Sequence, residues 1–326
     1  MGQQVEQQGA LSGVRGMLVA AGMGTRLAPL TDWLPKPAVP VGLRPVAAYM
    51  LAHLRSHGLR ELTVNLHHLA PALRQALQPY GQREGVDLHF VEEPSLLGTG
   101  GGIRNALDGV ADDELVVIAN GKLLFMPDLA AALQQHRRLG AVATMVLKPL
   151  PPASRFSPIH VDDEGFVRRM LDRSPEASAG GLKPMMFTGV QILAGSLLRR
   201  LPAEGCLVRD GYLHWLQEGL PVAYWSDTAP FWDVGVDLAA YHAANMAVRS
   251  GAFPVQGQAL DAAGNLVAEG VEIPASAELQ NCIVGANVRV APGARGQDLV
   301  IWPGTAVSGQ WERAVLTPTA AVPVPG

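Results

Sequence analysis

The sequence predicts an α/β protein with a Rossmann-like, doubly wound, mostly parallel sheet, followed by a smaller left-handed parallel β-helix. Two observations carry this prediction. Strand and helix patterns alternate with short connections through the first ~145 residues, and apolar residues recur every six positions after Pro254. The length of 326 residues fits one large domain plus a smaller one, or two medium domains.

Strands and amphipathic helices take turns in the N-terminal half. We expect a mobile arm over residues 1–15 and an α/β domain over 16–252. Its strands are expected at 16–22, 61–66, 87–93 and 114–121, and its helices at 46–59, 70–81, 105–110 and 127–140. Such alternation indicates parallel strands covered by helices on both faces.

The stretch from 143 to 251 is more irregular. Strands are expected at 159–162, 166–171, 187–193 and 221–225, and helices near 196–200, 211–218 and 237–248. We interpret this stretch as a second lobe of the same domain that closes a cleft over the sheet.

The six-residue repeat defines a third segment, 253–326. Val288, Ala294, Val300 and Ala306 follow one another at this spacing, and Gly285, Gly293 and Gly304 fall at expected turns. Each six-residue side of such a coil buries one apolar residue. Gly296 interrupts the pattern where an apolar residue is expected, and an all-β tail with chance periodicity is the alternative.

Composition excludes several classes of protein. The net charge of −4 argues against a nucleic-acid surface. The two cysteines, Cys206 and Cys282, lie far apart without a Cys-x-x-Cys pattern, which excludes a zinc cluster and suits a reducing cytoplasm. No apolar run approaches the ~20 residues of a membrane span, and the first residues lack the apolar core of a signal peptide.

The loop after the first strand, LVAAGMGTRLAPLT (18–31), carries the first candidate site. Gly22 and Gly24 lie in a turn whose backbone N–H groups can face a phosphate without a Cβ in the way. Thr25 can donate a hydroxyl, and Arg26 can hold two phosphate oxygens. A tight structural turn would look the same, and the pattern lacks the third glycine of a dinucleotide site and the Gly-Lys ending of a P-loop.

A lysine in the same loop strengthens the ligand interpretation. Lys36 in LPKPAVPVG (34–42) lies between two prolines, which leave its backbone little freedom. That setting is unusual for a lysine that is merely solvated. Arg26 and Lys36 together can clamp a triphosphate.

The segment GMGTRLAPLTDWLPKP (22–37) resembles the signature of the sugar-1-phosphate nucleotidylyltransferases, the nucleotide-sugar pyrophosphorylases, with a near-complete match over sixteen positions. TVNLHHLA (63–70), EEPSLLGTGGGIRNAL (92–107), FTGVQIL (187–193) and FWDVGVDLAAYHAAN (231–245) agree in order. The resemblance covers about residues 16–320 and is closest to the mannose-1-phosphate guanylyltransferase-like and the muramyl- or glucose-1-phosphate-like branches. It also implies a short hexapeptide-repeat β-helix at the C-terminus.

The resemblance implies transfer of a nucleotidyl group from a nucleoside triphosphate to a sugar 1-phosphate, giving an NDP-sugar and pyrophosphate. The catalytic residues would be Arg26 at the leaving pyrophosphate, Lys36 at the α-phosphate, and Lys122. The implied nucleotide-binding residues are Ala21, Gly22, Met23, Gly24, Thr25, Gly98, Thr99, Gly100 and Gly101. An ordinary flexible loop is the alternative for the second glycine group.

The sugar-phosphate contacts implied by the same resemblance are Asn120, Gly121, Lys183, Thr188 and Gly189. Asn120 can instead support its turn. Lys183 stands four residues before Phe187, where many relatives carry a Glu-Lys-Pro. A solvated loop lysine is the alternative there.

Magnesium in this family is held by two aspartates. Asp233 in FWDVG matches the second, but Lys122 stands at the place of the first, and an ammonium cannot ligate a metal. Three interpretations follow. Lys122 replaces the charge of Mg²⁺; or the site binds nucleotide with little turnover, as in a regulatory homologue; or Lys122 faces solvent and another carboxylate, Asp128 or Asp210, supplies the ligand.

The expected partners are therefore a nucleoside triphosphate and a sugar 1-phosphate, with no nucleic acid and no membrane. The β-helix is expected to serve a homo-oligomer or a homologous subunit. A nicotinamide-dependent oxidoreductase would need a third glycine and an acidic end to the second strand, where ELTVNLHH ends in Asn and His. An acyltransferase would need a histidine in its coils, but none follows His242.

Overall fold

The computed structural model describes residues 9–152, 156–171, 181–255 and 257–325. They form two compact units, each assembled from separate stretches of chain. The first unit holds residues up to 23 together with 50–121 and 125–229, and the second holds 24–49, 122–124 and the residues from 230 onward. The predicted domain boundaries at 16 and 253 therefore stay a prediction, because parts of the α/β region are grouped with the C-terminal residues.

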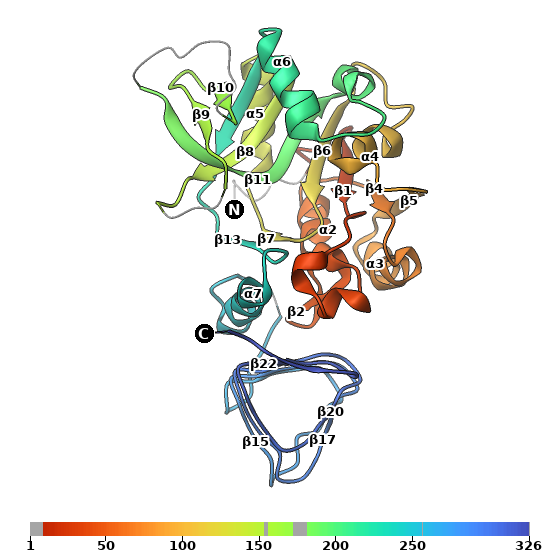
Figure 1. Ribbon diagram of the computed structural model, residues 1–326, viewed down its shortest axis with the longest axis vertical. Helices are drawn as coiled ribbons and strands as arrows, with labels where there is room; N and C mark the ends of the chain where they lie inside the picture. Colours follow the sequence, from red (N-terminus) through yellow and green to blue (C-terminus); the bar gives the residue numbers. More distant parts are fainter. Residues whose placement is uncertain (1–8, 153–155, 172–180, 256, 326) are drawn as a thin grey trace. The chain divides into compact units, whose positions relative to one another are not determined.

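A nine-stranded sheet organises the first unit (Figure 1). Its main path runs β10-β9-β11-β6-β1-β4-β5, and β8 pairs with both β11 and β12. The strands are β1 (Arg15–Val19), β4 (Glu61–Leu66), β5 (Asp87–Glu92), β6 (Leu115–Asn120), β8 (Ala143–Pro149), β9 (Ile159–Val161), β10 (Val167–Met170), β11 (Lys183–Ala194) and β12 (Val222–Ser226).

The predicted parallel core of this sheet is confirmed. Strand β1 lies between β4 and β6, parallel to both, and β4 is parallel to β5. Met17 and Leu18 in β1 are fully buried, as expected for a central strand covered on both faces. The carboxyl ends of β1 and β6 therefore lie side by side, with Val19 opposite Asn120.

Most strands of the predicted second lobe belong to the same sheet. The long strand β11 is antiparallel to β6, β8 and β9, and β12 pairs with β8, so β8 to β12 extend the sheet of the first unit. Its twelve residues exceed the predicted range 187–193. The structure is thus a mixed α/β fold with a parallel-rich central sheet.

Helices pack on this sheet: α3 (Ala70–Glu84) on β5, α4 (Gly98–Ala106) on β1 and β4, and α5 (Leu129–Arg138) on β8 and β12. The chain also forms helix α2 (Val46–Ser56), the 3₁₀ turn η4 (Gly195–Arg200), the π-helical turn η5 (Leu207–Tyr212) and helix α6 (Leu213–Gln217). One apolar core joins Met17 and Ile118 of the sheet to Ile103 of α4 and Trp215 of α6.

Two predictions for the first unit are wrong. A helix is expected at 105–110, but α4 spans Gly98–Ala106 and includes the glycine-rich segment itself, because tertiary packing outweighs the low helix propensity of glycine. Part of the predicted mobile arm is ordered. Leu11 is fully buried and its N–H donates to the His57 carbonyl over 2.8 Å, while residues 1–8 of the arm lie outside the described residues.

The second unit begins with the proline-rich loop. It forms three 3₁₀ turns, η1 (Thr25–Leu27), η2 (Leu30–Asp32) and η3 (Lys36–Ala38), and the short pair β2 (Pro40–Val41) and β3 (Arg44–Pro45). Strand β7 (Leu123–Phe125) pairs with β13 (Phe231–Asp233), and α7 (Leu238–Ser250) follows. The side-chain oxygen of Asn245 in α7 accepts the Gly42 N–H over 2.9 Å, so the helix holds the end of the loop in place.

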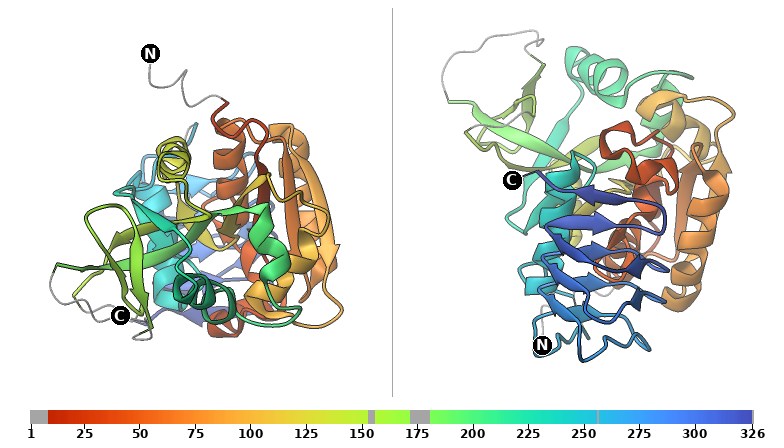
Figure 2. Two further views of the ribbon diagram at one scale, coloured as in Figure 1. Left: turned by 90° about the horizontal axis from the view of Figure 1, so that it is seen from above. Right: turned by 60° about the horizontal axis from the view of Figure 1, so that its bottom comes forward.

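The C-terminal residues form a three-sided coil of short strands, seen along its axis in Figure 1 and as a stack in Figure 2. Its parallel ladders are β14-β16-β19-β22, β15-β18-β21 and β17-β20. Their strands are β14 (Leu266–Val267), β15 (Glu278–Gln280), β16 (Ile283–Val284), β17 (Arg289–Val290), β18 (Arg295–Gln297), β19 (Val300–Ile301), β20 (Ala306–Val307), β21 (Gln310–Glu312) and β22 (Ala314–Leu316). Strand β23 (Ala321–Pro323) is antiparallel to β22.

The register of the coil explains two irregularities of the six-residue repeat. Ile283 pairs with Val300, and Val290 with Val307. Each of these turns of the coil is therefore one residue shorter than three six-residue sides. Val307 is consequently buried where Ala306 is predicted to be, and Ala306 is exposed. Gly296 does face inward, but Leu299 fills its place: a Cβ there would lie 2.5 Å from Leu299 Cδ1.

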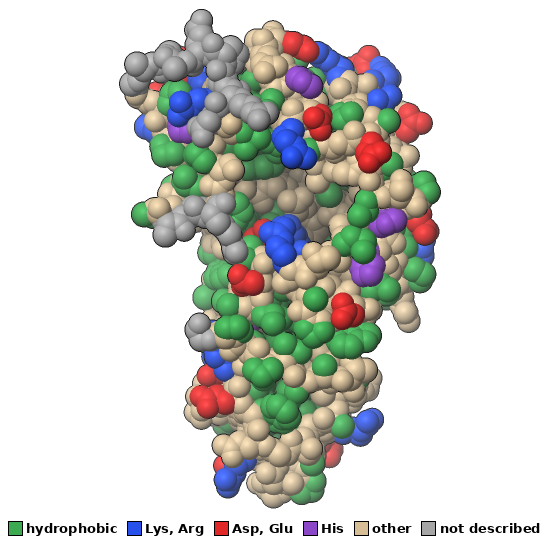
Figure 3. All heavy atoms as spheres, in the orientation of Figure 1, with side chains coloured by type: hydrophobic (Ala, Val, Ile, Leu, Met, Phe, Trp, Pro, Cys, Tyr) green, Lys and Arg blue, Asp and Glu red, His purple; other side chains and the backbone are tan. Residues whose placement is uncertain are grey.

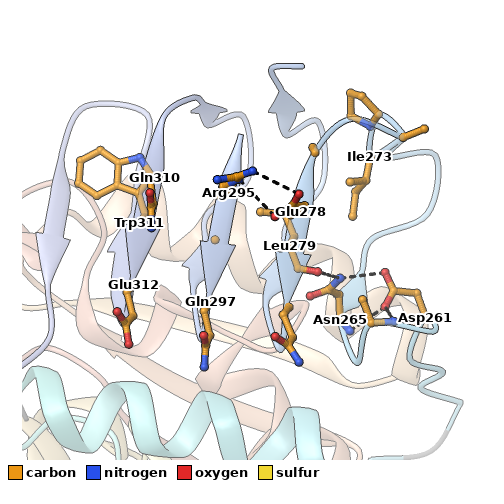
Figure 4. A pocket seen from close by; sticks show the side chains of 16 residues that line it. Asp261, Asn265, Ile273, Glu278, Leu279, Arg295, Gln297, Gln310, Trp311 and Glu312 are labelled. Atoms are coloured by element: carbon orange, nitrogen blue, oxygen red, sulfur yellow. Dashed lines mark hydrogen bonds and ion pairs between the residues drawn. The ribbon is translucent and has the colours of Figure 1, made fainter. Parts of the chain in front are cut away.

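One side of the coil carries polar side chains in columns (Figure 4). Arg295 on β18 pairs with Glu278 on β15, with a 3.2 Å contact from Nε to Oε2. Gln297 and Glu312 occupy equivalent positions on β18 and β21. Both members of the Arg295–Glu278 pair are more than 60% exposed, so the pair contributes little to stability.

Candidate functional site

Lys36 is the central residue of a charged cluster in the second unit. Pro35 and Pro37 flank it and set the backbone of η3, which places its side chain inside the unit with 9% exposure. Its Nζ donates to the Gly235 carbonyl over 3.0 Å. The lysine is therefore buried and held at a fixed position, as the sequence predicts.

Lys122 and Asp233 form an ion pair beside it. Strand β7 pairs with β13, and the Val234 N–H donates to the Lys122 carbonyl over 3.2 Å. The Lys122 Nζ lies 2.6 Å from Asp233 Oδ2, and Asp233 Oδ1 accepts the Gly235 N–H over 2.9 Å. The interpretation that Lys122 points to solvent is therefore wrong: its side chain is 23% exposed and bound to a carboxylate.

Gly235 makes room for both lysines. A Cβ at this position would lie 2.5 Å from Lys36 Cδ and 2.7 Å from Lys122 Cδ, closer than real carbon contacts permit. A side chain at this position would therefore force one or both lysine side chains to move. The residue was not among the predicted site residues, although it lies in the FWDVG motif that pointed to Asp233.

The electrostatics of this cluster are dominated by positive charge. The pKa of Lys36 is lowered from 10.5 to about 8, first by burial and then by the neighbouring charges of Lys122 and Arg26, while Asp233 opposes the shift. The charges that act on Lys36 are therefore two cations and one carboxylate. Unbalanced cationic charge held by a rigid backbone is the arrangement that a polyphosphate needs.

The start of the predicted phosphate loop has the expected geometry. Gly24 has a φ of 74°, a conformation that favours glycine, and the Thr31 hydroxyl donates to its carbonyl over 3.1 Å. Thr25 and Arg26 follow in η1 with exposed side chains. In the first unit, Ala21 is buried just after β1, whereas Gly22 and Met23 are exposed.

A buried polar network holds the strand end that precedes this loop. The Asn65 side chain accepts the Ala20 N–H over 2.7 Å and donates to Glu93 Oε1 over 2.6 Å. Glu93 Oε2 accepts the Leu97 N–H over 3.2 Å, next to the first residue of α4. Asn65 and Glu93 are 2% and 3% exposed, so one network positions both predicted nucleotide-binding segments of the first unit.

The glycines of α4 are required by packing within the protein. A Cβ at Gly98 would lie 2.4 Å from the Gly205 carbonyl oxygen, and one at Gly101 would lie 2.4 Å from the Ala203 carbonyl oxygen. The Gly100 N–H donates to the Gly205 carbonyl, and Thr99 Oγ1 accepts the Leu207 N–H. Gly100 and Gly101 are buried within helix α4, so the alternative of an ordinary flexible loop is wrong, and Gly98 and Thr99 are the exposed members of the group.

The predicted sugar-phosphate residues gather at a bulge in β11. Gly189 has a φ of 86°, and a Cβ there would lie 2.2 Å from the Asn120 Nδ2 atom. The Thr188 hydroxyl donates to the Val146 carbonyl over 2.7 Å and the residue is 3% exposed. Asn120 and Gly189 are therefore neighbours, and Gly121 directly follows β6. The Thr188 hydroxyl is bound to a backbone carbonyl of the same sheet.

Lys183 lies apart from the bulge, at the first position of β11. Its Nζ contacts Asp163 Oδ1 over 2.5 Å, and both side chains are more than 60% exposed. The ion pair raises the pKa of Lys183. The ion pair with Asp163 thus explains the position of the Lys183 side chain without a substrate. Its role at a sugar phosphate stays a prediction.

The two alternative metal carboxylates are occupied elsewhere. Asp128 caps α5 by accepting the Ala131 N–H, and Asp210 accepts the Cys206 N–H over 2.7 Å. Among the described residues, no group of three or more His, Cys, Asp or Glu side chains is arranged to hold a metal ion. Each carboxylate thus has a backbone partner of its own, and the expectation that Asp128 or Asp210 replaces the missing aspartate stays a prediction.

Comparison with known families decides the class of this chain. The sequence model of the family described as Nucleotidyl transferase matches residues 15–186, more than half of the chain. The protein belongs to the nucleotidyl transferase family. The match runs from β1 to β11 and contains the loop of Arg26 and Lys36, the network of Asn65 and Glu93, and Lys122.

Two relatives of this nucleotidyl transferase carry different names. It is 30% identical to a UTP–glucose-1-phosphate uridylyltransferase of Synechocystis, over 64% of this chain and 56% of the relative. It is 27% identical to a mannose-1-phosphate guanylyltransferase of Mycobacterium tuberculosis, over 90% of this chain and 81% of that protein. A guanyltransferase of the same name from Yarrowia lipolytica is matched over 48% of its length, so the chain spans about half of several relatives.

A solved structure shares the fold. HddC from Yersinia pseudotuberculosis aligns with a TM-score of 0.59 at 20% identity and covers 71% of this chain and 98% of its own. At this identity the likeness concerns the fold alone.

Charged side chains of both signs lie on the face of the molecule drawn in Figure 3. Basic and acidic side chains are interspersed over the described residues of this face. None of the helices in the described ranges has the length and hydropathy needed to cross a bilayer.

Loss of the buried network should be measurable as lost stability. We expect Asn65→Ala to lower the free energy of unfolding by about 2 to 4 kcal/mol, because it leaves the Ala20 N–H unpaired and removes a donor from a buried carboxylate. Urea denaturation measures the change. Asn105→Ala, an exposed asparagine in α4, is the control, with a change within about 0.5 kcal/mol. Equal effects of the two variants would contradict the network.

Proposed function

We propose that the protein transfers a nucleotidyl group from a nucleoside triphosphate to a sugar 1-phosphate. An oxygen of the sugar phosphate attacks the α-phosphorus, the bond from this phosphorus to the pyrophosphate oxygen breaks, and pyrophosphate leaves. Such a displacement needs positioning and neutralisation of charge and little covalent work by the protein. Membership in the nucleotidyl transferase family and the names of the relatives support this proposal.

The observation that carries the proposal is the buried Lys36 with its cationic neighbours. Lys36 sits on a stiffened backbone, is anchored by the Gly235 carbonyl, and has Lys122 and Arg26 close enough to lower its pKa. A cation that is costly to bury indicates a ligand of opposite charge. In the proposed reaction Lys36 holds the α-phosphate and Arg26 the departing pyrophosphate.

A panel of substrates tests this function. The full chain is incubated with GTP, UTP, dTTP, ATP or CTP and with mannose, glucose or other sugar 1-phosphates, and both pyrophosphate and NDP-sugar are measured. We expect one pair to release both products in equal amounts. No release from any pair, in the presence of Mg²⁺ as the partner of the triphosphate, would overturn the proposal.

The Lys122–Asp233 ion pair favours a second candidate function. A chain without the usual pair of aspartates can retain nucleotide or NDP-sugar binding and serve as a regulatory homologue. Calorimetry separates the two candidates: saturable nucleotide binding without pyrophosphate release supports the regulatory function.

The three-sided coil is proposed to be a left-handed hexapeptide-repeat β-helix, because its parallel ladders and inward apolar residues suit that architecture. We propose that it packs against a second copy or a homologous subunit in the cytoplasm. Sedimentation of the full chain and of a chain truncated after residue 252 would compare their masses.

Nucleotide binding should weaken as pH rises through 8. Because Lys36 has a pKa of about 8 and the phosphate binds its protonated form, affinity for the triphosphate should fall about tenfold between pH 7 and pH 9. Calorimetry at several pH values measures it. Lys36→Arg should remove this decline, since a guanidinium stays protonated. An equal decline in both proteins would assign the effect to another group.

A further inference from the structure

The Lys122–Asp233 ion pair occupies the place where the family resemblance puts a divalent metal. We propose that the Lys122 ammonium is the resident cation of this cluster and keeps Mg²⁺ off Asp233, so that the protein binds nucleotide without a metal ion of its own. The role of the pair in turnover rests on the proposed function. Its exclusion of metal does not, and can be measured separately.

The ligands that Mg²⁺ requires do not fit this cluster. Magnesium prefers oxygen ligands in an octahedron, with one or two carboxylates from the protein. The Asp233 carboxylate already receives the Lys122 ammonium on Oδ2 at 2.6 Å and the Gly235 N–H on Oδ1 at 2.9 Å. A divalent ion on either oxygen would stand within a few ångströms of the ammonium and be repelled by it.

Neighbouring charges act in the same direction. Lys36 lies beside Lys122, and Arg26 contributes to the same electrostatic field. The Asp233 carboxylate opposes these cations, and the described residues contain no cluster of three potential metal ligands. A metal would therefore enter a region that is already cationic.

Backbone pairing positions the two residues of this ion pair. The pairing of β7 with β13 and the Val234 N–H bond to the Lys122 carbonyl bring the two residues together. Gly235 leaves space for the Lys122 stem. The two side chains are 23% and 11% exposed, so water and salt screen their attraction less than at an open surface.

A lysine supplies one positive charge where Mg²⁺ supplies two. The magnesium that accompanies a nucleoside triphosphate in solution enters as part of the substrate. Lys122, Lys36 and Arg26 then provide the positive charge of this cluster. Neutralisation of the reacting phosphates is thereby assigned to side chains and to the metal of the substrate.

Manganese binding to the nucleotide-free protein tests the proposal without reference to activity. Electron paramagnetic resonance of free Mn²⁺, supported by calorimetry, gives the number of sites and their affinity. We expect no site on the wild-type protein tighter than about 1 mM. We expect Lys122→Asp to create one site at least tenfold tighter, through the new carboxylate and Asp233.

Two control variants separate the causes. Lys122→Met removes the ammonium without adding a ligand, and Lys122→Asp combined with Asp233→Asn should lose the created site. Stoichiometric Mn²⁺ binding to the wild type that Asp233→Asn abolishes would overturn the proposal, and this measurement needs no variant at Lys122. Failure of a folded Lys122→Asp protein to bind Mn²⁺ would also overturn it.

The two proposals fail separately. A wild-type protein that binds no Mn²⁺ and releases no pyrophosphate in the substrate panel disproves nucleotidyl transfer and supports the built-in cation. Pyrophosphate release together with a tight Mn²⁺ site at Asp233 supports nucleotidyl transfer and disproves the built-in cation.

Discussion

Replacing Lys36 by methionine is expected to reduce nucleotidyl transfer by about 10²- to 10³-fold, the effect of removing a preorganised group that stabilises charge in a transition state. The same change should leave the protein at least as stable at pH 7. The lowered pKa of Lys36 means that the folded state carries its charge at a cost, and methionine fills the space of the stem without that charge. Pyrophosphate release and thermal unfolding are the two measurements.

The pH dependence of stability tests whether the buried charge of Lys36 destabilises the folded state. Between pH 8 and pH 10.5 the unfolded chain keeps a proton on Lys36 that the folded protein has released, so wild-type stability should rise with pH in this window. Lys36→Met should lack this contribution. Arg295→Met removes an exposed charge of the same unit and is the control for both measurements. A loss of stability larger than the loss in that control would show that Lys36 supports the fold.

Gly98→Ala is expected to destabilise the first unit by about 3 to 5 kcal/mol, in the range of severe single substitutions. Gly98 has a φ of 73°, and its new Cβ would meet the Gly205 carbonyl oxygen at 2.4 Å. The backbone would have to move, which breaks the bonds from Gly205 N–H to the Leu97 carbonyl and from Gly100 N–H to the Gly205 carbonyl. Urea denaturation gives the magnitude.

Gly109→Ala is the matched control for this substitution. Its φ is 87°, but no atom lies within 4 Å of the added Cβ, so the backbone conformation alone should cost about 1 to 2 kcal/mol. The difference between the variants isolates the contact with Gly205. Similar losses of stability in both would mean that the segment of Gly205 moves aside freely.

The order of strands and helices could largely be predicted from the sequence because local patterns determine them. Short apolar runs that alternate with helix patterns predict β1, β4, β5 and β6. The prolines on both sides of Lys36 indicate a fixed cation. Both conclusions depend on residues close together in the chain. The family resemblance likewise rests on contiguous motifs, and it led to the correct family.

The remaining features depend on contacts between distant residues. The glycines of α4 pack against residues 203–207, about a hundred positions later, and this contact turns an expected loop into a helix. Asn65 and Glu93 acquire their roles only when β4 and β5 stand side by side. The partner of Lys122 is 111 positions away; the family resemblance implies that Lys122 and Asp233 lie at one site, but the ion pair between them could not be foreseen.

The last strand of the coil, β23, covers the edge of the strand before it. Each parallel strand leaves N–H and C=O groups ready to pair with another strand, and a stack that ends openly can recruit further chains. Strand β23 covers β22 in the opposite direction and ends at Pro323, which has no N–H to offer a further strand. The chain itself thus covers the edge of β22, which protects this end of the coil against fibre-like growth.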